Sequence, residues 1–487
     1  MRPAAPAGRT LVGVSWPGWV AIVGATVAAY LAVGPFLPDD AFIHLRYAAN
    51  LADGHGWVYN VGQVSADGMT SPLFVGLVAL MALVVRSVEA ASDVVMIGSM
   101  LVAGWATYRL IGSHRPAAAG LGAILLLTSP WLGSTRGMES WLFIALTSVA
   151  VLAARERYPV VAGAAAGALG LVRGEGVLLV LLLVAQLWWR DRRAPVRFAA
   201  AAVVPLAAWS AYAAALFGTP LPGTLTAKVA QGRSGFWGEG LLYLRGFVDI
   251  ADKFRFGLWA LAIVAIVAVA AAVGVAALVQ RHRRDPVTAV HRLLVTPGVI
   301  TIGALAAGVV VAYGLVFQVP AYHWYYATPV HAAVLVAALG LADLIRRGGK
   351  ALVLAGLVVG ALALAGIAAT PDDEPVPGYV AAAAWFREHV PAGASIAATE
   401  IGGLGYHVTN PIVDYLGLLS DRAAEHLGRG DLAWWLEAFE PDYWLVHDPA
   451  WPFEAPAMQT EFFDANYLEF AEVDAFVVYR RRGAPVR

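Results

Sequence analysis

The chain has 487 residues, of which 59% are hydrophobic and only 14% are charged, and its formal net charge is −1. A soluble chain would carry about a quarter charged residues, so this composition excludes an ordinary soluble protein. The chain contains no cysteine, which excludes disulfides, thiolate metal sites and cysteine nucleophiles. Apolar runs recur from Leu11 to Ala369, which predicts a polytopic α-helical membrane protein.

The first apolar run, 11–34, is predicted to be a retained membrane helix, because no small-residue cleavage motif precedes the acidic pair that follows it. That pair, Asp39 and Asp40, is costly to desolvate at a membrane boundary, and packing does not require it. We therefore expect chemistry at the membrane surface, with a carboxylate as general base. The alternative is a helix cap, since Asp is a favoured N-cap and Ala41 to Leu51 has helical spacing.

Basic clusters set the predicted topology, because loops rich in Arg and Lys stay cytoplasmic. The clusters are Arg109 with Arg115; Arg155 with Arg157; Arg190, Arg192, Arg193 and Arg197; Arg281, Arg283, Arg284 and Arg292; and Arg346, Arg347 and Lys350. Placing them all inside gives about eleven spans, at 11–34, 92–110, 117–132, 139–154, 159–172, 175–189, 198–217, 256–279, 293–319, 325–345 and 350–369.

One apolar segment, Ser71 to Val85, does not fit this count. It is about fifteen residues long, shorter than the roughly 20 that a helix needs to cross the bilayer. We therefore expect it to lie along the outer face, within a first external loop at 35–91. A twelve-span arrangement that ends inside the cell is the alternative.

Aromatic and polar residues mark the outer boundary in this topology. The first loop contains Arg46, Trp57 and Asp67 among glycines and other turn residues, and His323 lies in an aromatic string that precedes a later span. Aromatic residues at the headgroup boundary are common membrane anchors, so Trp57 alone is weak evidence. Together with the polar residues, it suits a sugar–phosphate cleft. His323 is predicted either to contact phosphate or to be an interfacial residue.

Several cations also fall outside, where the positive-inside rule disfavours them. Arg136, Arg173 and Lys228 are examples, and such groups suit a lipid-linked phosphate or diphosphate. The alternative is ion pairing, because Arg136 lies near Glu139 and Arg173 lies two residues from Glu175.

The composition changes near 370–375, where the transmembrane part (1–370) is predicted to end. Beyond it, Val380 to His389 has helical spacing, and Ser395 to Thr399, Tyr443 to His447 and Ala475 to Tyr479 have the pattern of short buried strands. Glycines at 402, 403 and 405 predict a turn. We expect residues 371–487 to form a small external α/β domain.

No HExxH, P-loop or Rossmann glycine pattern is present. The chain does contain a set of longer strings that follow one another in a recognisable order. In the first loop these are Pro38-Asp39-Asp40-Ala41-Phe42-Ile43-His44-Leu45-Arg46-Tyr47, Gly54-His55-Gly56-Trp57 and Asp67-Gly68-Met69-Thr70-Ser71-Pro72. Later strings are Thr135-Arg136-Gly137-Met138-Glu139, Leu171-Val172-Arg173-Gly174-Glu175 and Ile401-Gly402-Gly403-Leu404-Gly405-Tyr406. The chain thereby resembles the GT-C membrane glycosyltransferases, and among them the terminal arabinofuranosyltransferases of the actinobacterial cell wall.

The resemblance implies a GT-C architecture, a polyprenyl-phosphate sugar donor, with arabinofuranose as the candidate sugar, and a glycan acceptor outside the membrane. It implies an acidic first-loop residue as the catalytic carboxylate, and we assign this role to Asp40, with Asp39 supporting or orienting it. The donor phosphate is assigned to Arg173, Lys228 and His323, and the sugar or acceptor pocket to Arg46, Asp67, Glu139 and Trp57.

We expect a multi-pass plasma-membrane protein whose site and C-terminal domain are extracytoplasmic, with the bilayer, the lipid-linked sugar and the glycan acceptor as partners and no nucleic acid. The sequence identifies no cofactor with certainty, and a divalent metal is left open because Asp40, Asp67 and Glu139 could meet in space, although nothing in their spacing demands a metal. The rival reading is a transporter or flippase of a lipid-linked saccharide, which needs ionisable residues within the spans.

Overall fold

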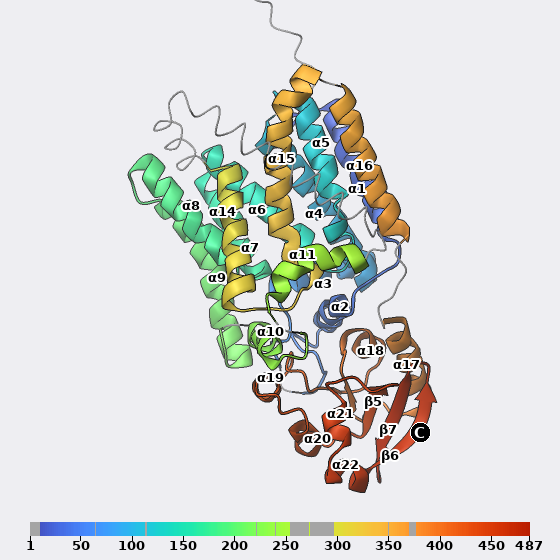
Figure 1. The fold of residues 1–487 in the computed structure, drawn as a ribbon. Coiled ribbons are helices and arrows are strands. Elements are labelled where there is room, and N and C mark those ends of the chain that lie inside the picture. The colour runs from blue at the N-terminus through green and yellow to red at the C-terminus, as the bar shows by residue number, and fades with distance from the viewer. Residues whose placement is uncertain are drawn as a thin grey trace, which may run out of the picture.

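The computed structural model is a mostly helical bundle joined to a smaller domain that contains a β-sheet (Figure 1). It describes residues 10–253, Ala272 and residues 297–487, except positions 64, 113, 221, 239, 349 and 370–375. The predicted span 256–279 therefore lies outside the described residues, apart from Ala272.

The bundle helices follow the apolar runs of the sequence. They are α1 (Trp16–Val33), α4 (Val88–Ile111), α5 (Pro116–Leu127), α6 (Ser140–Arg155), α7 (Pro159–Val172), α8 (Gly176–Asp191), α9 (Val196–Phe217), α14 (Val299–Val311), α15 (Ala327–Gly348) and α16 (Lys350–Ala369). Among the described helices, four are long and apolar enough to cross a membrane by length and composition, at Trp16–Val33, Val88–Ile111, Val196–Phe217 and Val299–Val316. Serine caps and early prolines start several of them, as where the Ser15 hydroxyl accepts from Gly18 N–H at α1.

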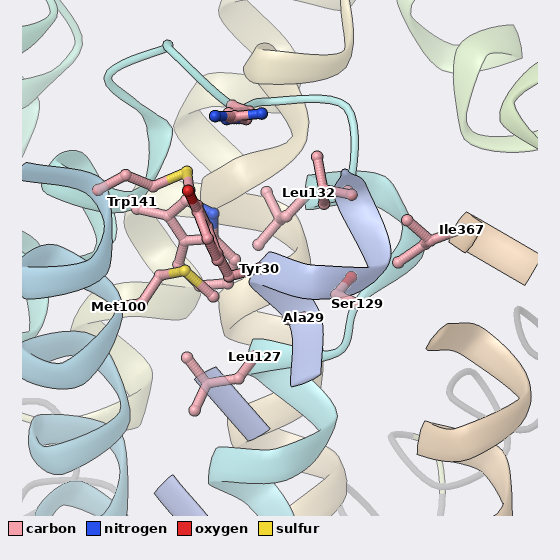
Figure 2. Close-up of a pocket in the computed structure, with 12 residues that line it drawn as sticks. Ala29, Tyr30, Met100, Leu127, Ser129, Leu132, Trp141 and Ile367 are labelled. Atoms are coloured by element: carbon pink, nitrogen blue, oxygen red, sulfur yellow. The ribbon is translucent and has the colours of Figure 1, made fainter. Parts of the chain in front are cut away.

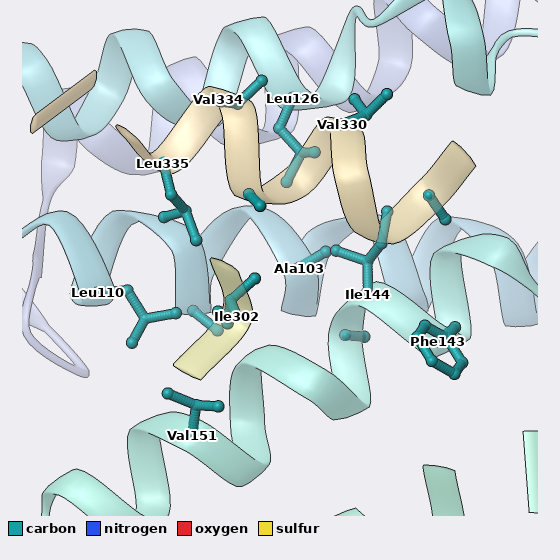
Figure 3. Packing of buried hydrophobic residues seen from close by; sticks show 14 of the residues in the cluster. Ala103, Leu110, Leu126, Phe143, Ile144, Val151, Ile302, Val330, Val334 and Leu335 are labelled. Carbon is teal, nitrogen blue, oxygen red and sulfur yellow. The ribbon is translucent and has the colours of Figure 1, made fainter. Parts of the chain in front are cut away.

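Small residues let the bundle helices approach closely. A Cβ added to Gly163 on α7 would lie 2.2 Å from the Phe198 carbonyl oxygen of α9, and one on Gly167 would lie 2.4 Å from that of Ala202. Larger side chains fill the rest of the core, where Leu126, Ile144 and Ile302 are buried in one cluster (Figure 3). Close contact through glycine is typical of membrane helices, which gain from packing rather than from water exclusion.

Helices α1 and α4 run in opposite directions, and their ends show where the first loop lies. At one end, the Arg109 guanidinium donates to the Val12 carbonyl at 2.8 Å. At the other end, Arg136 donates to the Gly34 carbonyl and pairs with Asp93 at 2.6 Å. The segment between α1 and α4 therefore leaves the bundle and returns to it at the same end.

That segment contains α2 (Asp39–Ala52) and α3 (Pro72–Val85), which lie at the end of the bundle nearest the sheet domain (Figure 1). Helix α3 has 14 residues and is about 21 Å long at 1.5 Å per residue, shorter than a bilayer core of about 30 Å. Helices α10 (Gly223–Ser234) and α11 (Leu242–Lys253) lie at the same end. The candidate site is built there.

Basic residues gather at the opposite end. Arg109 pairs with Glu156 at 2.5 Å, Arg155 donates to the Arg109 carbonyl at 2.8 Å, and Arg190 donates to the Ala154 carbonyl at 2.9 Å. Three of the predicted basic clusters thus meet at one end of the bundle, away from the acidic pair of α2.

The C-terminal domain has a five-stranded sheet in the order β4-β3-β5-β7-β6. The strands are β4 (Ile412–Asp414), β3 (Ile396–Ala398), β5 (Tyr443–His447), β7 (Phe476–Arg481) and β6 (Tyr467–Val473). Strand β3 is parallel to β4 and β5, whereas β7 is antiparallel to β5 and β6. Three strands coincide with predicted ones, while β4 and β6 were not predicted.

Helices surround this sheet: α17 (Val376–His389), α18 (Gly402–His407), α19 (Asp421–Gly428), α20 (Trp434–Phe439), α21 (Ala455–Met458) and α22 (Glu461–Asn466). The glycine string at 402–405 was predicted as a turn, but it forms the short helix α18. Helix α18 lies against α2 (Figure 1), and close packing against another chain segment explains why glycines are needed in a helix that they would otherwise weaken.

Candidate functional site at the end of the bundle

Helix α2 begins at the acidic pair, so Asp39 and Asp40 occupy its first turn. The N-cap residue is Pro38, and no side-chain capping hydrogen bond is formed. The alternative reading of the acidic pair as a helix cap is therefore not what the structure shows. Both carboxylates still gain from the partial positive charge at the start of the helix, and their side chains are used elsewhere.

The two aspartates have different surroundings. Asp39 is 8% exposed and accepts hydrogen bonds from the backbone N–H groups of Gly402 at 2.8 Å and Gly403 at 2.7 Å. Burial raises the pKa of Asp39 to about 6, against the opposing effect of these donors. The Asp40 side chain is 21% exposed and lies 3.6 Å from the Lys228 ammonium. Asp40 is thus the more accessible carboxylate, and Asp39 is held by the C-terminal domain.

Lys228 is the cation closest to this pair among the described contacts. It lies on α10 and is 6% exposed, and its Nζ stands 3.9 Å from the ring centroid of Tyr322. The Tyr322 hydroxyl donates to Gln231, one turn along α10, at 3.1 Å. Lys228 is therefore held between the aromatic face of Tyr322 and the carboxylate of Asp40. The separation of 3.6 Å from Asp40 is longer than a hydrogen bond, so a more strongly charged anion can replace Asp40 as the partner of Lys228.

A cavity of about 480 Å³ opens beside Lys228. Its polar lining includes Asp67, Glu175 and Lys228, and its apolar walls come from α7, α8, α9 and α14, with residues such as Leu171, Val177, Leu178, Leu206, Trp209 and Val309. The cavity wall therefore combines ionisable groups with apolar side chains of the bundle. Lys228 belongs both to this cavity and to the ion pair with Asp40.

Asp67 also lines the cavity. Its Oδ1 atom is buried and has no hydrogen-bond partner in the described part of the chain. Burial, together with repulsion from Asp421 of the C-terminal domain, raises the pKa of Asp67 to about 7. A carboxyl group with this pKa can accept or donate a proton near neutral pH.

Arg173 and Glu139 form a buried ion pair instead of lining the cavity. The Arg173 guanidinium is 2.9 Å from Glu139 and 2.6 Å from Glu175, and it stacks over Tyr325 at 4.5 Å. Glu139 is fully buried, and Glu175 also accepts from the Tyr313 hydroxyl at 2.6 Å. The ion-pair alternative considered for Arg173 therefore describes this geometry. For Arg136, the expected ion pair with Glu139 is not formed, because Arg136 pairs with Asp93 instead.

Three further predicted residues lie away from the cavity lining. Arg46 donates to the backbone carbonyls of Tyr59 at 2.7 Å and Asn410 at 3.2 Å, so its assignment to the sugar pocket is replaced by a role between the first loop and the C-terminal domain. Trp57 packs edge-on against Trp209 at 5.1 Å and lies behind that cavity residue. His323 forms a hydrogen bond with the Ser134 hydroxyl.

The structure adds two residues that sequence reasoning missed. His44 follows Asp40 by one helical turn and is 4% exposed, and its surroundings include Asp40 and Glu139. Burial lowers the pKa of His44. Its spacing from Asp40 was visible in the sequence. Glu400 of the C-terminal domain lies within hydrogen-bonding reach of Asp39, and no local signal could have placed it there.

A second, very small cavity lies inside the bundle (Figure 2). Its volume is about 10 Å³, and Tyr30, Met100, Leu132, Trp141 and Ile367 are among its lining residues. Such a volume holds one water molecule at most. Arg136 also borders it and is paired there with Asp93, so this part of the bundle is structural.

Within the part of the chain that the structure describes, no group of three or more His, Asp or Glu side chains is arranged to hold a metal ion. In particular, Asp40 pairs with Lys228, and Glu139 pairs with Arg173. Asp40, Asp67 and Glu139 thus do not form the metal site that their sequence spacing had left open.

The fold described above is similar to that of a solved protein over nearly the whole length of both chains. The solved structure of ArnT from Cupriavidus metallidurans bound to undecaprenyl phosphate superposes with a TM-score of 0.60 at 13% sequence identity, over 96% of this chain and 98% of that chain. The apo state of the same protein gives a TM-score of 0.58 at 14% identity, over 95% of this chain and 98% of that chain.

Sequence comparisons add one match. Residues 371–484 match the family described as "Domain of unknown function (DUF8728)", which corresponds to the C-terminal domain seen here. No curated protein matches the chain. The structural likeness therefore establishes the fold, and the chemistry must be argued from the site.

Proposed function

We propose that this chain is a membrane glycosyltransferase that moves a sugar from a polyprenyl-phosphate donor to an acceptor outside the cytoplasm. The observation that carries the proposal is that Lys228, which lines a largely apolar cavity of about 480 Å³, lies 3.6 Å from the Asp40 carboxylate. A carboxylate beside an ammonium group provides a base for the acceptor and a cation for the leaving phosphate.

The proposed reaction is a single displacement at the anomeric carbon. Asp40 takes the proton of the acceptor hydroxyl, whose oxygen forms the new glycosidic bond. The bond between the anomeric carbon and the phosphate oxygen breaks, and its electron pair leaves with the polyprenyl phosphate. Lys228 stabilises the charge that develops on that phosphate. Asp67 faces the same cavity and is proposed to contact the sugar.

The cavity suits a lipid-linked donor because its walls combine both polarities. Lys228 is available to the phosphate at one part, and residues such as Leu178 and Val309 line the remainder. ArnT, whose fold the chain shares, was solved with undecaprenyl phosphate, which supports the same class of lipid here. Arabinofuranose as the sugar, and a cell-envelope glycan as the acceptor, are proposed from the resemblance of the first-loop strings.

The proposed orientation follows from charge. Arg109, Arg155 and Arg190 lie at the end of the bundle opposite the site, and basic ends are retained in the cytoplasm. The site, the first loop and the C-terminal domain are then extracytoplasmic in the plasma membrane. A lipid-phosphate headgroup at the outer leaflet lies at the level of such a site.

The test is the Asp40→Asn variant, assayed in membranes or nanodiscs with a polyprenyl-phosphate sugar. Loss of the base is expected to lower kcat by about 10²–10⁴-fold, the usual contribution of general base catalysis. Asp53→Asn is the matched control, because Asp53 is exposed at the other end of α2, and its turnover should be unchanged. Full transfer by folded Asp40→Asn would contradict the assignment.

The transporter reading predicts a different product. A flippase moves the intact lipid-linked saccharide, whereas a transferase releases free polyprenyl phosphate. Release that depends on Asp40 supports the transferase, and movement of intact donor between leaflets without release supports the transporter. The charged groups described above lie at the two ends of the bundle, which favours the transferase.

A further inference from the structure

The C-terminal domain contacts the first loop through its own backbone. The N–H groups of Gly402 and Gly403 donate to the two oxygens of the Asp39 carboxylate. The Gly405 carbonyl accepts from Arg46, and the Ile401 carbonyl accepts from the Tyr59 hydroxyl at 2.6 Å. One short stretch of the domain therefore satisfies groups on α2 and on the loop that follows it.

Steric fit makes glycine necessary at part of this contact. A Cβ at position 402 would lie 1.9 Å from the Asp39 carbonyl oxygen and 2.6 Å from its carboxylate. A Cβ at position 403 would lie 3.4 Å from the same carboxylate, which is an ordinary van der Waals distance. Two neighbouring glycines thus make similar hydrogen bonds to Asp39, but only Gly402 has no room for a side chain.

A second attachment lies two turns further along α2. Arg46 is 7% exposed and, besides Gly405, its guanidinium reaches the Asn410 carbonyl at 3.2 Å. Residues seven apart lie on the same face of a helix, so Asp39 and Arg46 attach one face of α2 to the C-terminal domain. A helix held at two points two turns apart can neither slide nor rotate freely.

These contacts fix the helix that carries Asp40. Asp40 follows Asp39 directly, is not bonded by these glycines, and turns instead toward Lys228 of α10. We infer that the C-terminal domain is part of the transfer site, because Gly402 and Gly403 hold Asp39 and so orient Asp40 toward Lys228. Asp39 is then a positioning residue, and Asp40 alone acts as the base. This inference rests on the proposed function.

The experiment compares Gly402→Ala with Gly403→Ala, one residue apart and identical in chemistry. Misplacement of a catalytic group by about 1 Å can cost about 10²-fold in rate, so Gly402→Ala is expected to lower kcat by roughly that factor. The KM for the lipid donor should change by less than about twofold, because the described cavity lining, which includes Lys228, contains no residue of positions 401–405. Gly403→Ala should retain both constants within about twofold.

A loss confined to KM, or equal kcat values for the two variants, overturns the inference. A purely structural role would lower the amount of folded protein without changing kcat per folded molecule, which tryptophan fluorescence and size-exclusion chromatography separate. If Gly402→Ala does not fold, Asp39→Asn replaces it: one acceptor oxygen remains for two N–H groups, and kcat is expected to fall about tenfold at constant KM. Wild-type kcat in folded Asp39→Asn also overturns the inference.

Hydrogen exchange separates this inference from the proposed function. If the wild-type chain transfers no sugar from any polyprenyl-phosphate donor, the proposed function fails, yet exchange at 401–407 and at α2 still reports on the attachment. Faster exchange at both places in Gly402→Ala, with wild-type exchange in Gly403→Ala, supports positioning of α2 by the domain. Unchanged exchange at α2 in Gly402→Ala overturns it.

Discussion

Replacing Arg173 with Met tests whether this cation supports the site or binds the donor. Arg173 is 2% exposed, and Glu139 is fully buried. The Arg173 guanidinium lies 2.9 Å from the Glu139 carboxylate and 2.6 Å from the Glu175 carboxylate, and it neutralises both. Removing one partner of a buried pair leaves uncompensated charge and typically costs about 3–5 kcal/mol. Arg173→Met should therefore lower the free energy of unfolding by about that amount.

The measurement is denaturant or thermal unfolding in detergent micelles, followed by tryptophan fluorescence. Arg109→Met is the matched control at the other end of the bundle, because Arg109 and its partner Glu156 have side chains that are 22% and 34% exposed. Partly exposed pairs contribute up to about 1 kcal/mol. The same samples are titrated with undecaprenyl phosphate, so that stability and lipid affinity are compared in one preparation.

A ligand-binding arginine would behave in the opposite way. Arg173→Met would then keep wild-type stability, or exceed it, and would lose affinity for undecaprenyl phosphate. Equal stability losses in the Arg173 and Arg109 variants would also refute the reasoning, because burial would then have no measurable effect. The expected result is a large loss at Arg173 alone, with affinity retained in the folded fraction.

Two further predictions concern the polar part of the cavity. Lys228→Met should raise the KM for the lipid donor about 10–100-fold, because it removes a charge-assisted hydrogen bond of about 1.5–3 kcal/mol. Lys228→Arg should recover part of this loss. An unchanged dissociation constant for undecaprenyl phosphate in Lys228→Met would exclude phosphate binding at this residue. The pKa of Asp67 is raised to about 7, so its contribution to stability is present below about pH 4 and is lost as the pH rises through 7. Asp67→Asn should therefore be more stable than wild type by about 1–3 kcal/mol at pH 8 and equal to it near pH 4, as measured by thermal unfolding; a pH-independent difference would contradict this.

The apolar runs predicted the bundle well because few other arrangements satisfy them. The span predicted at 159–172 is α7 (Pro159–Val172), and the segment 350–369 is α16 (Lys350–Ala369). In lipid, the backbone N–H and C=O groups of a single segment find hydrogen-bond partners only within a helix. A long apolar run therefore has essentially one structure. Strand β6 escaped prediction because its residues are mostly exposed or half-buried, so its sequence lacks the continuous apolar run of a buried strand.

The candidate site was harder to predict because its partners are distant in sequence. The acidic pair and Lys228 were singled out, and the structure brings Asp40 and Lys228 together. Arg46, in contrast, is separated by 364 residues from Asn410, whose carbonyl accepts its hydrogen bond. A guanidinium that binds backbone carbonyls and one that binds a phosphate look the same in the sequence, since both need only the donors of the side chain.

The attachment of the C-terminal domain also bears on how such proteins diverge. The domain contacts the first loop through main-chain atoms at positions 401–405 and through the rings of Tyr406 and His407, which lie against Phe42 of α2. Main-chain atoms are supplied by every residue type. The parts of the domain's surface that do not touch α2 can therefore change their side chains without disturbing the acidic pair, provided that positions 402 and 405 remain glycine. Recognition of new glycans could then arise on that surface, and domains could be exchanged between relatives, while the transfer chemistry stays constant.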